Sequence, residues 1–296
     1  MKKIFFFCCL LASLFLTSCL TYLDDKDIHF KPRLVLYCRL VAQYDTTILQ
    51  LSHTVSAFSG SNRKIEEVKN AIVEISDDNQ HWVKMEYNTP LQYYYVLKTV
   101  FPINEGKTYY VRAAAPSYDE VSASCTVPCF RETHLKPVYV ESDKDTHWGQ
   151  AFNEPHKHLF LEWDDYPGEN NYYTFFFNNL YYDFNEETGE IIPMYYDWEQ
   201  ISDMNSKVKN FSDLELDGKK ISMLFTALPN NMYPLHFDIT MVQMDKHSYS
   251  FEKSYNSEKV TDDMMSVFLL EPTQVYTNIK NGYGLFCALA MKDYSF

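Results

Sequence analysis

Apolar and polar side chains alternate with a period of two along most of this chain, which is the pattern of half-buried antiparallel strands. In the segment 121–127, Val121, Ala123, Cys125 and Val127 share one face, while serine and threonine occupy the other. The same alternation occurs earlier in the chain, at 34–41, 48–55, 71–76 and 109–113. Six or seven short strands within about 100 residues are typical of a β-sandwich. We therefore expect residues 28–129 to form an N-terminal β-sandwich.

The alternation is interrupted over residues 130–157, whose charged residues, glycine and prolines are typical of a connector with one short strand near 138–140. From 158 to 296 the period of two returns and predicts a second β-rich domain. The strands expected there are 159–163, 172–177, 221–225, 236–244, 275–279 and 285–291, with a short helix within 248–257. Residues 185–189 and the dipeptide Asp217-Gly218 carry hairpin-turn signals. The predicted fold class is all-β, with two antiparallel β-sandwich-like domains of the immunoglobulin or fibronectin III-like kind.

The first residues of the chain have the layout of a lipoprotein signal. A basic start at 1–3 precedes an apolar run at 4–16, which is shorter than the roughly 20 residues that a membrane-spanning helix needs. The sequence Leu16-Thr17-Ser18-Cys19 then places small residues before a cysteine, as lipoprotein signal peptidase requires. We expect residues 1–18 to be removed as a signal peptide and Cys19 to receive the lipid. An ordinary signal peptide with a chance cysteine, or an uncleaved anchor, is the alternative.

Residues 19–27 are predicted to be a tether between the lipid and the first domain. Asp24, Asp25 and Asp27 form an acidic cluster shortly after Cys19. This cluster resembles the export tag that sends Bacteroides-type lipoproteins to the outer face of the outer membrane. We therefore expect a lipid-anchored outer-membrane protein at the cell surface. The alternative is that these acids only keep the tether solvated.

Charge and glycine content exclude several functional classes. The formal net charge is −14, and removal of the two lysines in the signal peptide makes it more negative. Such a polyanion has no surplus of cations for binding nucleic acid. The eight glycines of the chain leave no room for the loops that cradle phosphates or dinucleotides. Since the chain also has no Gly-x-Ser-x-Gly or His-Glu-x-x-His motif, we expect a non-enzymatic protein without a cofactor.

Two groups of polar residues are candidate metal ligands. The first lies near the domain junction and consists of His147, Glu154, His156 and His158. The second lies in one turn-rich loop and consists of Asp164, Asp165, Glu169 and Asn170. Zinc needs three or four converging ligands, and calcium needs six or more oxygens. Because polar residues are common at solvated junctions and turns, we predict no metal site at either group.

Four cysteines follow Cys19, in an exported setting that permits disulfides. They are Cys38, Cys125, Cys129 and Cys287. In a straight strand, Cys125 and Cys129 would lie about 13 Å apart, which is too far for a disulfide. We favour a role for these cysteines as small buried residues. A small loop disulfide between Cys125 and Cys129, with the chain bent at Pro128, is the alternative.

The most suggestive binding feature is a run of rings between residues 172 and 184. The candidates for ligand or partner contact are Tyr172, Tyr173, Phe175, Phe177, Tyr181 and Tyr182. Both faces of the predicted strand carry rings, so one face can fill the domain core. The other face can meet the first domain, a protein partner or a sugar ring, because aromatic residues often anchor interfaces. The alternative is burial of both faces within the fold.

Several soft motifs occur together in a characteristic order. Near the C-terminus, residues 271–286 contain an Asn-Ile pair, then a glycine-rich step and a phenylalanine. Four other features precede this segment. They are the lipobox, which is the sequence at 16–19, the strands of 109–128, the segment 161–173 and Leu-Asp-Gly-Lys at 216–219. In this combination the chain resembles the Bacteroidota lipoprotein group called domain-of-unknown-function family 4249. The resemblance implies an outer-membrane lipoprotein with two β-domains, often encoded beside a SusC-like TonB-dependent transporter, and it brings no catalytic residues.

Our first functional hypothesis is a non-enzymatic surface lipoprotein that is held to the membrane by the lipid on Cys19. It would act as the accessory partner of a SusC-like TonB-dependent barrel in nutrient uptake. One alternative is a stand-alone lipoprotein that binds a glycan or peptide, which predicts a soluble ligand and no stable barrel partner. Another is a fimbrial or adhesive component, which predicts oligomers with an exchanged strand.

Overall fold

The computed structural model describes residues 30–56, 66–142, 156–184, 191–196, 210–229, 236–259 and 274–296. The chain divides into two compact units, of which the first comprises residues 1–32 and 55–64. The described residues of this unit form no helix or strand. The second unit, residues 33–54 and 65–296, holds all the elements named below. Within the described residues the elements are sixteen strands and one helix, which confirms the all-β, sandwich-like fold class.

The N-terminal sandwich consists of two sheets around a common core. One sheet has the strand order β1 (Leu34–Val41), β2 (Thr46–His53), β6 (Tyr93–Leu97), β5 (Glu86–Asn88). The other has the order β4 (Val83–Lys84), β3 (Ile72–Ser76), β7 (Thr108–Ala114), β8 (Val121–Thr126). Leu36 and Leu49 of the first sheet share the core with Val73 and Val111 of the second. When the strands are lettered in chain order, the sheets are A-B-E-D and C′-C-F-G, which is the immunoglobulin-type arrangement.

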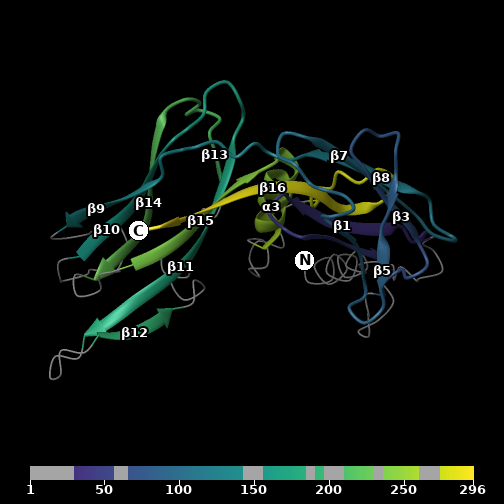
Figure 1. The fold of residues 1–296 in the computed structure, drawn as a ribbon, viewed down its shortest axis with the longest axis horizontal. Helices are drawn as coiled ribbons and strands as arrows, with labels where there is room; N and C mark the ends of the chain where they lie inside the picture. The colour runs from purple at the N-terminus through teal and green to yellow at the C-terminus, as the bar shows by residue number, and fades with distance from the viewer. Residues whose placement is uncertain are drawn as a thin grey trace, which may run out of the picture. The chain divides into compact units, whose positions relative to one another are not determined.

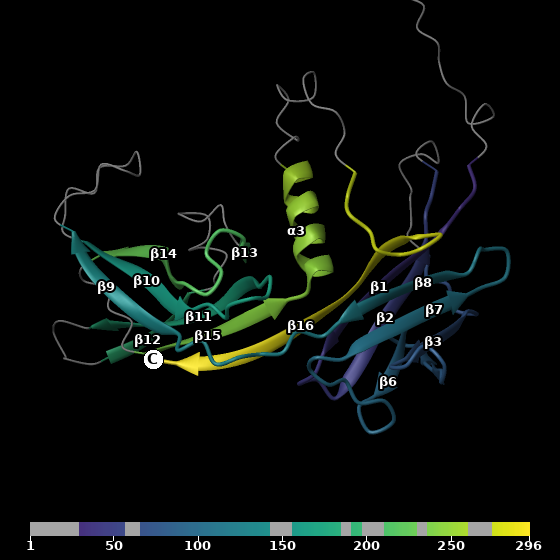
Figure 2. The ribbon, with the colours of Figure 1, turned by 90° about the horizontal axis from the view of Figure 1, so that it is seen from above.

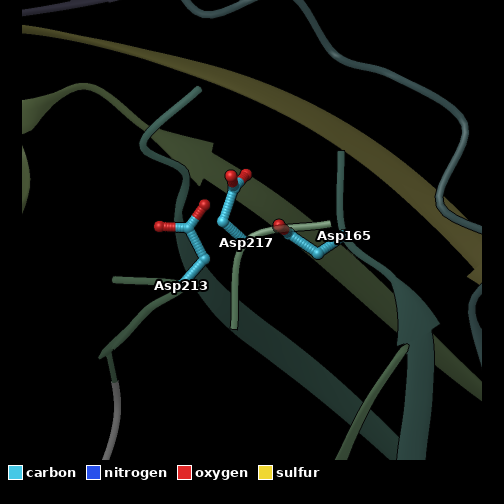
Figure 3. Close-up of side chains that lie close together, drawn as sticks. All are labelled: Asp165, Asp213 and Asp217. Atoms are coloured by element: carbon cyan, nitrogen blue, oxygen red, sulfur yellow. The ribbon is translucent and has the colours of Figure 1, made fainter. Parts of the chain in front are cut away.

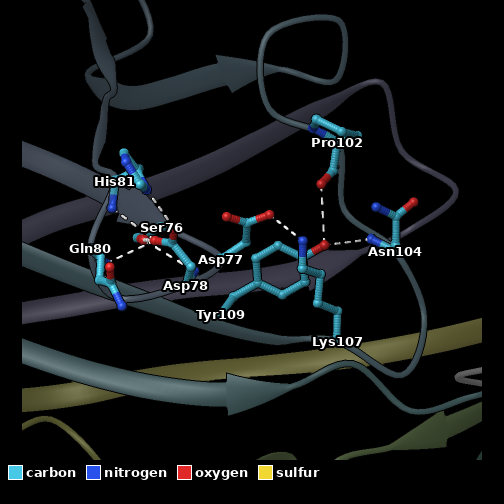
Figure 4. Close-up of polar contacts among 9 residues, drawn as sticks. All are labelled: Ser76, Asp77, Asp78, Gln80, His81, Pro102, Asn104, Lys107 and Tyr109. Carbon is cyan, nitrogen blue, oxygen red and sulfur yellow. Dashed lines mark hydrogen bonds and ion pairs between the residues drawn. The ribbon is translucent and has the colours of Figure 1, made fainter.

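Tyr109 fixes one end of this sandwich, as Figure 4 shows. Its side chain is fully buried at the second position of β7. The hydroxyl accepts a hydrogen bond from the N–H of Asn104 at 2.7 Å and donates one to the carbonyl of Pro102 at 3.2 Å. Immunoglobulin-like domains carry such a tyrosine near the start of strand F, bonded to main chain a few residues upstream. The strand order and this tyrosine therefore both indicate an immunoglobulin-type sandwich.

The C-terminal sandwich is formed by the strands that follow. Its smaller sheet has the order β14 (Lys220–Pro229), β10 (His156–Asp164), β9 (Lys136–Ser142). In its other sheet, β12 (Ile191–Tyr196), β11 (Tyr172–Phe184) and β15 (His236–Met244) are consecutive neighbours, and β13 (Asn210–Ser212) pairs with β11. Leu161 and Trp163 from the first sheet pack with Tyr173 and Ile239 from the second.

The last strand, β16 (Tyr283–Ser295), belongs to both sandwiches. Residues 283–289 pair with β1 in parallel, and residues 289–295 pair with β15 in antiparallel. In Figure 1, β16 is the yellow strand that lies beside β1 at its N-terminal end and beside β15 at its C-terminal end. Residues 285–290 are all buried, because both faces of the strand are covered there. The sheet is thus continuous from β12 through β16 to β5.

Two glycines let β16 approach β1. Gly284 has φ +108°, and a Cβ there would overlap the carbonyl oxygen of Leu36. A Cβ on Gly282 would lie 2.6 Å from the carbonyl oxygen of Leu34 and from a methyl of Val121. Since glycine alone has no Cβ, the glycine-rich step noted in the sequence has a structural explanation here.

The single described helix, α3 (Lys246–Lys259), starts directly after β15 and lies beside β16, as Figure 2 shows. Asp245 is its N-cap, because the Oδ1 atom accepts a hydrogen bond from the N–H of Ser248 at 2.7 Å. Tyr249 of the helix stacks on Tyr172 at a centroid distance of 4.6 Å. Within the described residues, no helix is both long and apolar enough to cross a bilayer.

The strands predicted at 34–41 and 236–244 match β1 and β15, and the helix predicted within 248–257 is α3. Two expectations are wrong. Residues 275–279 form no strand, and Asp217-Gly218 does not close a two-residue hairpin, since β13 pairs with β11 whereas β14 pairs with β10. The short strand predicted near 138–140 is β9, which pairs with β10. The division into domains at 28–129 and 158–296 stays a prediction, and residues 1–27 lie outside the described part.

Candidate functional site

The rings predicted to make contacts on β11 divide between two faces. Tyr173 and Phe175 point into the core, where they pack on Trp163 at centroid distances of 5.7 and 5.1 Å. Tyr173 has no exposed surface and Phe175 is 8% exposed. The prediction of ligand contact is therefore corrected for these two residues, because their side chains fill the space between the two sheets.

The outer face of β11 carries Tyr172 and Phe176. Tyr172 is half-buried against Tyr249 of α3, whereas Phe176 is 49% exposed. Phe176 is thus the exposed ring among the side chains of β11 that the structure describes. The side chains of Phe177, Tyr181 and Tyr182, like Cys19, lie outside the described residues, so the roles assigned to them stay predictions.

Three aspartates converge where the loops of the C-terminal sandwich meet, and we call them the carboxylate cluster. Asp165 directly follows β10, Asp213 directly follows β13, and Asp217 lies in the turn before β14. One carboxylate oxygen from each residue lies within 4.8 Å of those of the other two. Figure 3 shows the three side chains approaching one another, Asp165 from one loop and Asp213 and Asp217 from another. Asp213 is fully buried and Asp165 is 6% exposed, whereas Asp217 is exposed.

Hydrogen bonds orient the carboxylates of Asp165 and Asp217. The Tyr173 hydroxyl donates to Asp165 Oδ1 at 2.8 Å, and the N–H of Gly218 donates to Asp165 Oδ2 at 2.9 Å. The N–H of Gly168 donates to Asp217 Oδ1 at 2.7 Å. These bonds tie the loop after β10 to the turn before β14. Burial, and the hydrogen bond to Asp165, raise the pKa of the Tyr173 hydroxyl, so it remains a donor.

Asp213 is the member of the cluster with an unsatisfied atom. Its Oδ2 accepts a hydrogen bond from the N–H of Asn171 at 2.9 Å, but its buried Oδ1 has no hydrogen-bond partner. Burial raises the pKa of the Asp213 carboxyl above its ordinary value, and the charges of Asp165 and Asp217 raise it further. The hydrogen bond from Asn171 acts in the opposite direction. A negative charge at Asp213 is therefore costly in this structure.

A separate groove of about 380 Å³ lies on the outer face of β7 and β8. Trp82 forms part of its wall and is covered on one face by Arg112, whose guanidinium carbon lies 4.1 Å from the ring centroid. The Nε–H of this arginine donates a hydrogen bond to Glu74 Oε2 at 2.7 Å, which holds the guanidinium in place. The other lining residues with polar side chains are Asn79, Tyr110, Ser122, Ser124, His247, Asn278 and Lys280. A half-buried indole amid polar groups can hold a small polar ligand.

The turn after β3 positions this groove, and Figure 4 shows its hydrogen bonds. Asp78 Oδ1 accepts from the N–H groups of Gln80 and His81, both at 2.8 Å, as in an Asx turn. Asn79, with φ +59°, and Trp82 follow from this turn into the groove wall. The hydrogen bonds from His81 hold the pKa of the Asp78 carboxyl below its ordinary value.

The sequence offers four candidate metal ligands in the turn-rich loop, namely Asp164, Asp165, Glu169 and Asn170. Of these four, Asp165 alone belongs to the carboxylate cluster. Asp164 lies 3.4 Å from a ring nitrogen of His134, and Glu169 pairs with Arg131 at 2.9 Å. Asn170 is exposed. The side chains of the histidine group at 147–158 lie outside the described residues.

Three of the four cysteines fit the role of small buried residues, namely Cys38, Cys125 and Cys287. All four thiols are free, and burial raises the pKa of Cys287 to about 11. Cys129 is exposed, which corrects the expectation for that residue. It lies beyond the end of β8, where the strand's inward alternation has ended.

No local sequence pattern marks Asp213 and Asp217 as partners of Asp165. The pair Asp217-Gly218 is a turn signal, and Asp213 has no signal of its own. Their convergence depends on β13 pairing with β11 while β14 pairs with β10. Such long-range pairing is not readable from local periodicity.

The fold defines an all-β protein with an immunoglobulin-type sandwich, a second two-layered sandwich and a last strand that both share. Residues 21–295 match the family model described as Domain of unknown function (DUF4249), and the chain belongs to this family. The match confirms the resemblance seen in the sequence. A search of curated proteins returned no match.

Proposed function

We propose that this protein is a surface-exposed outer-membrane lipoprotein that acts, without enzymatic activity, as the accessory partner of a TonB-dependent nutrient transporter. The observation that carries the proposal is the place of the lipobox. Cys19 lies two residues before the start of the family match at residue 21. A lipid at this position would hold the entire family domain at the membrane. Because the chain is acidic and gains nothing from an anionic surface, the acyl chains must provide the attachment.

The outer face of β11 is the contact surface that we assign to the barrel partner. Phe176 offers an exposed ring there, and aromatic side chains are enriched among the residues that dominate protein interfaces. Its neighbours in the strand, Tyr173 and Phe175, are held in the core. The strand is therefore anchored on one face while its other face presents Phe176.

The test is purification of the tagged protein from native outer membranes in mild detergent, followed by mass spectrometry. We expect a TonB-dependent barrel in near-stoichiometric amount, and loss of membrane attachment in Cys19→Ala. Phe176→Ser should lose the barrel while retaining the fold. Tyr44→Ser removes another exposed ring, which is 57% exposed in the N-terminal sandwich, and should keep the barrel. A protein that is purified alone, without any barrel, would contradict the proposed partnership.

A second candidate function is the binding of a glycan or peptide in the groove beside Trp82. The half-buried indole and its polar surroundings favour it, since aromatic rings stack on sugars and polar groups fix their orientation. Quenching of tryptophan fluorescence by soluble oligosaccharides, abolished in Trp82→Ala, would support this function. Unchanged fluorescence over an oligosaccharide and peptide panel would exclude these ligands.

A further inference from the structure

The carboxylate cluster has the spacing of ligands around one cation. Calcium binds oxygen ligands at about 2.3–2.6 Å, so two oxygens on the same ion are separated by at most about 5 Å. One oxygen each from Asp165, Asp213 and Asp217 lies within 4.8 Å of the other two. The three residues come from two loops that meet at this point, so the geometry is a product of the fold and not of one loop.

The second observation is the unpartnered atom of Asp213. The residue is fully buried, and its Oδ1 forms no hydrogen bond. Buried carboxylate oxygens are ordinarily satisfied by a donor or a cation. Figure 3 shows an oxygen of Asp213 directed toward the carboxylate of Asp217. An ion between these residues would satisfy the Asp213 atom that the protein leaves unpaired.

The charge of the cluster is also uncompensated within the described residues. None of the ion pairs found among them involves Asp165, Asp213 or Asp217. Two of these three carboxylates, those of Asp165 and Asp213, are buried, where an unpaired negative charge is costly. A divalent cation would offset most of the charge that two buried aspartates carry.

The donors around the cluster behave as supports for metal ligands. The N–H groups of Gly168 and Gly218 and the hydroxyl of Tyr173 fix the carboxylates without adding charge, and each carboxylate oxygen has a second lone pair for an ion. We propose that Asp165, Asp213 and Asp217 form a calcium-binding site that fastens the loop after β10 to the turn before β14. Calcium is preferred over magnesium because it tolerates an irregular set of oxygens.

The test uses the full-length chain after chelator treatment. Terbium replaces calcium at oxygen sites, and Tyr173, which bonds directly to Asp165, together with Trp163 beside it, can sensitise its emission. We expect terbium luminescence that calcium displaces. We also expect millimolar calcium to raise the thermal midpoint by about 5 °C, and magnesium to raise it less.

Variants distinguish this site from adventitious binding at other acids. Asp213→Asn retains an acceptor for the Asn171 N–H and should reduce terbium affinity at least tenfold. Asp217→Asn alters an exposed residue and retains an acceptor for the Gly168 N–H, so the variant should fold, and it should weaken binding as well. Glu215→Gln removes the same charge from an exposed residue of the same turn and should leave affinity unchanged.

Two results would overturn the site. One is a parent protein that shows neither sensitised luminescence nor a calcium-dependent midpoint. The other is an equal loss of affinity in Glu215→Gln and in the two aspartate variants, which would indicate diffuse attraction to acidic surface. If magnesium matched calcium in both measurements, the assignment to calcium would be wrong.

Discussion

Asp245 combines two opposing demands on one side chain. As the N-cap of α3 it accepts a hydrogen bond from the Ser248 N–H, which a charged carboxylate does well. The residue is only 8% exposed, however, and its Oδ2 has no hydrogen-bond partner. Burial raises the pKa of the carboxyl to about 6, although the hydrogen bond from the Ser248 N–H acts to lower it. Capping is therefore retained at a position where ionisation costs free energy.

The consequence is a pH dependence of stability with a defined sign. Between the ordinary pKa of 3.8 and the folded value of about 6, the native state binds more protons than the unfolded state. Stability from this residue is therefore full below about pH 4 and declines as the pH rises to about 6. Asp245→Asn keeps an N-cap and cannot ionise. We expect its free energy of unfolding, relative to the parent, to improve by up to about 3 kcal/mol between about pH 4 and pH 7. Urea denaturation across this range measures it, and a constant difference between the two proteins would refute the assignment.

Residues also differ in how well the sequence predicts them. The core face of β11 follows from the alternation, because Tyr173 and Phe175 share one side of the strand. Asp213 was not predictable, since its partners are supplied by other strands. Cys129 was mispredicted because the inward alternation of β8 stops before it. Local pattern assigns a side chain to a face, whereas its neighbours depend on which strands pair.

At the scale of elements, the strands with one buried face were the easiest to predict. β1 and β15 match their predicted bounds. The failure at 275–279 has a specific cause, which is Asn278. Its Oδ1 accepts from the Phe286 N–H at 3.0 Å, and its Nδ2 donates to the Phe286 carbonyl at 2.7 Å. This side chain provides bonds that a partner strand would otherwise provide, so the apolar segment lies along β16 without becoming a strand.

The pairing of β16 with β1 depends on Gly284. An added Cβ would overlap the carbonyl oxygen of Leu36, and φ is +108°. We expect Gly284→Ala to lower the free energy of unfolding by about 2–4 kcal/mol, measured by urea denaturation. Gly168→Ala is the matched control, since Gly168 also has positive φ (+85°) but has open space around it. The control should lose only about 1 kcal/mol. If both variants lost the same free energy of unfolding, the requirement for glycine at position 284 would come from its positive φ and not from the close approach of β16 to β1.

At the scale of the whole chain, β16 joins the two sandwiches through main-chain hydrogen bonds. Phe286 and Ala288 pack in the N-terminal core, while Tyr294 packs against the C-terminal core. Loss of either sandwich would leave half of this strand without a partner. The sequence predicted a strand at 285–291 but not its double role, because its partners lie near opposite ends of the chain.

This shared strand predicts cooperative unfolding. Trp82 reports on the N-terminal sandwich and Trp163 on the C-terminal core. In variants that keep only one of these two among the four tryptophans of the chain, we expect denaturation curves with the same midpoint. Two separated transitions would show that the sandwiches unfold independently despite β16.

The position of β16 also sets an order of events during synthesis. Until Tyr283–Ser295 has been made, β1 is an unprotected sheet edge with β2 as its single neighbour. Such edges invite pairing with other chains. A nascent chain that still lacks β16 would therefore present a surface that chaperones and proteases recognise, and β16 conceals it. Pairing of β1 with β16 thus protects this edge only after the segment 283–295 has been synthesised.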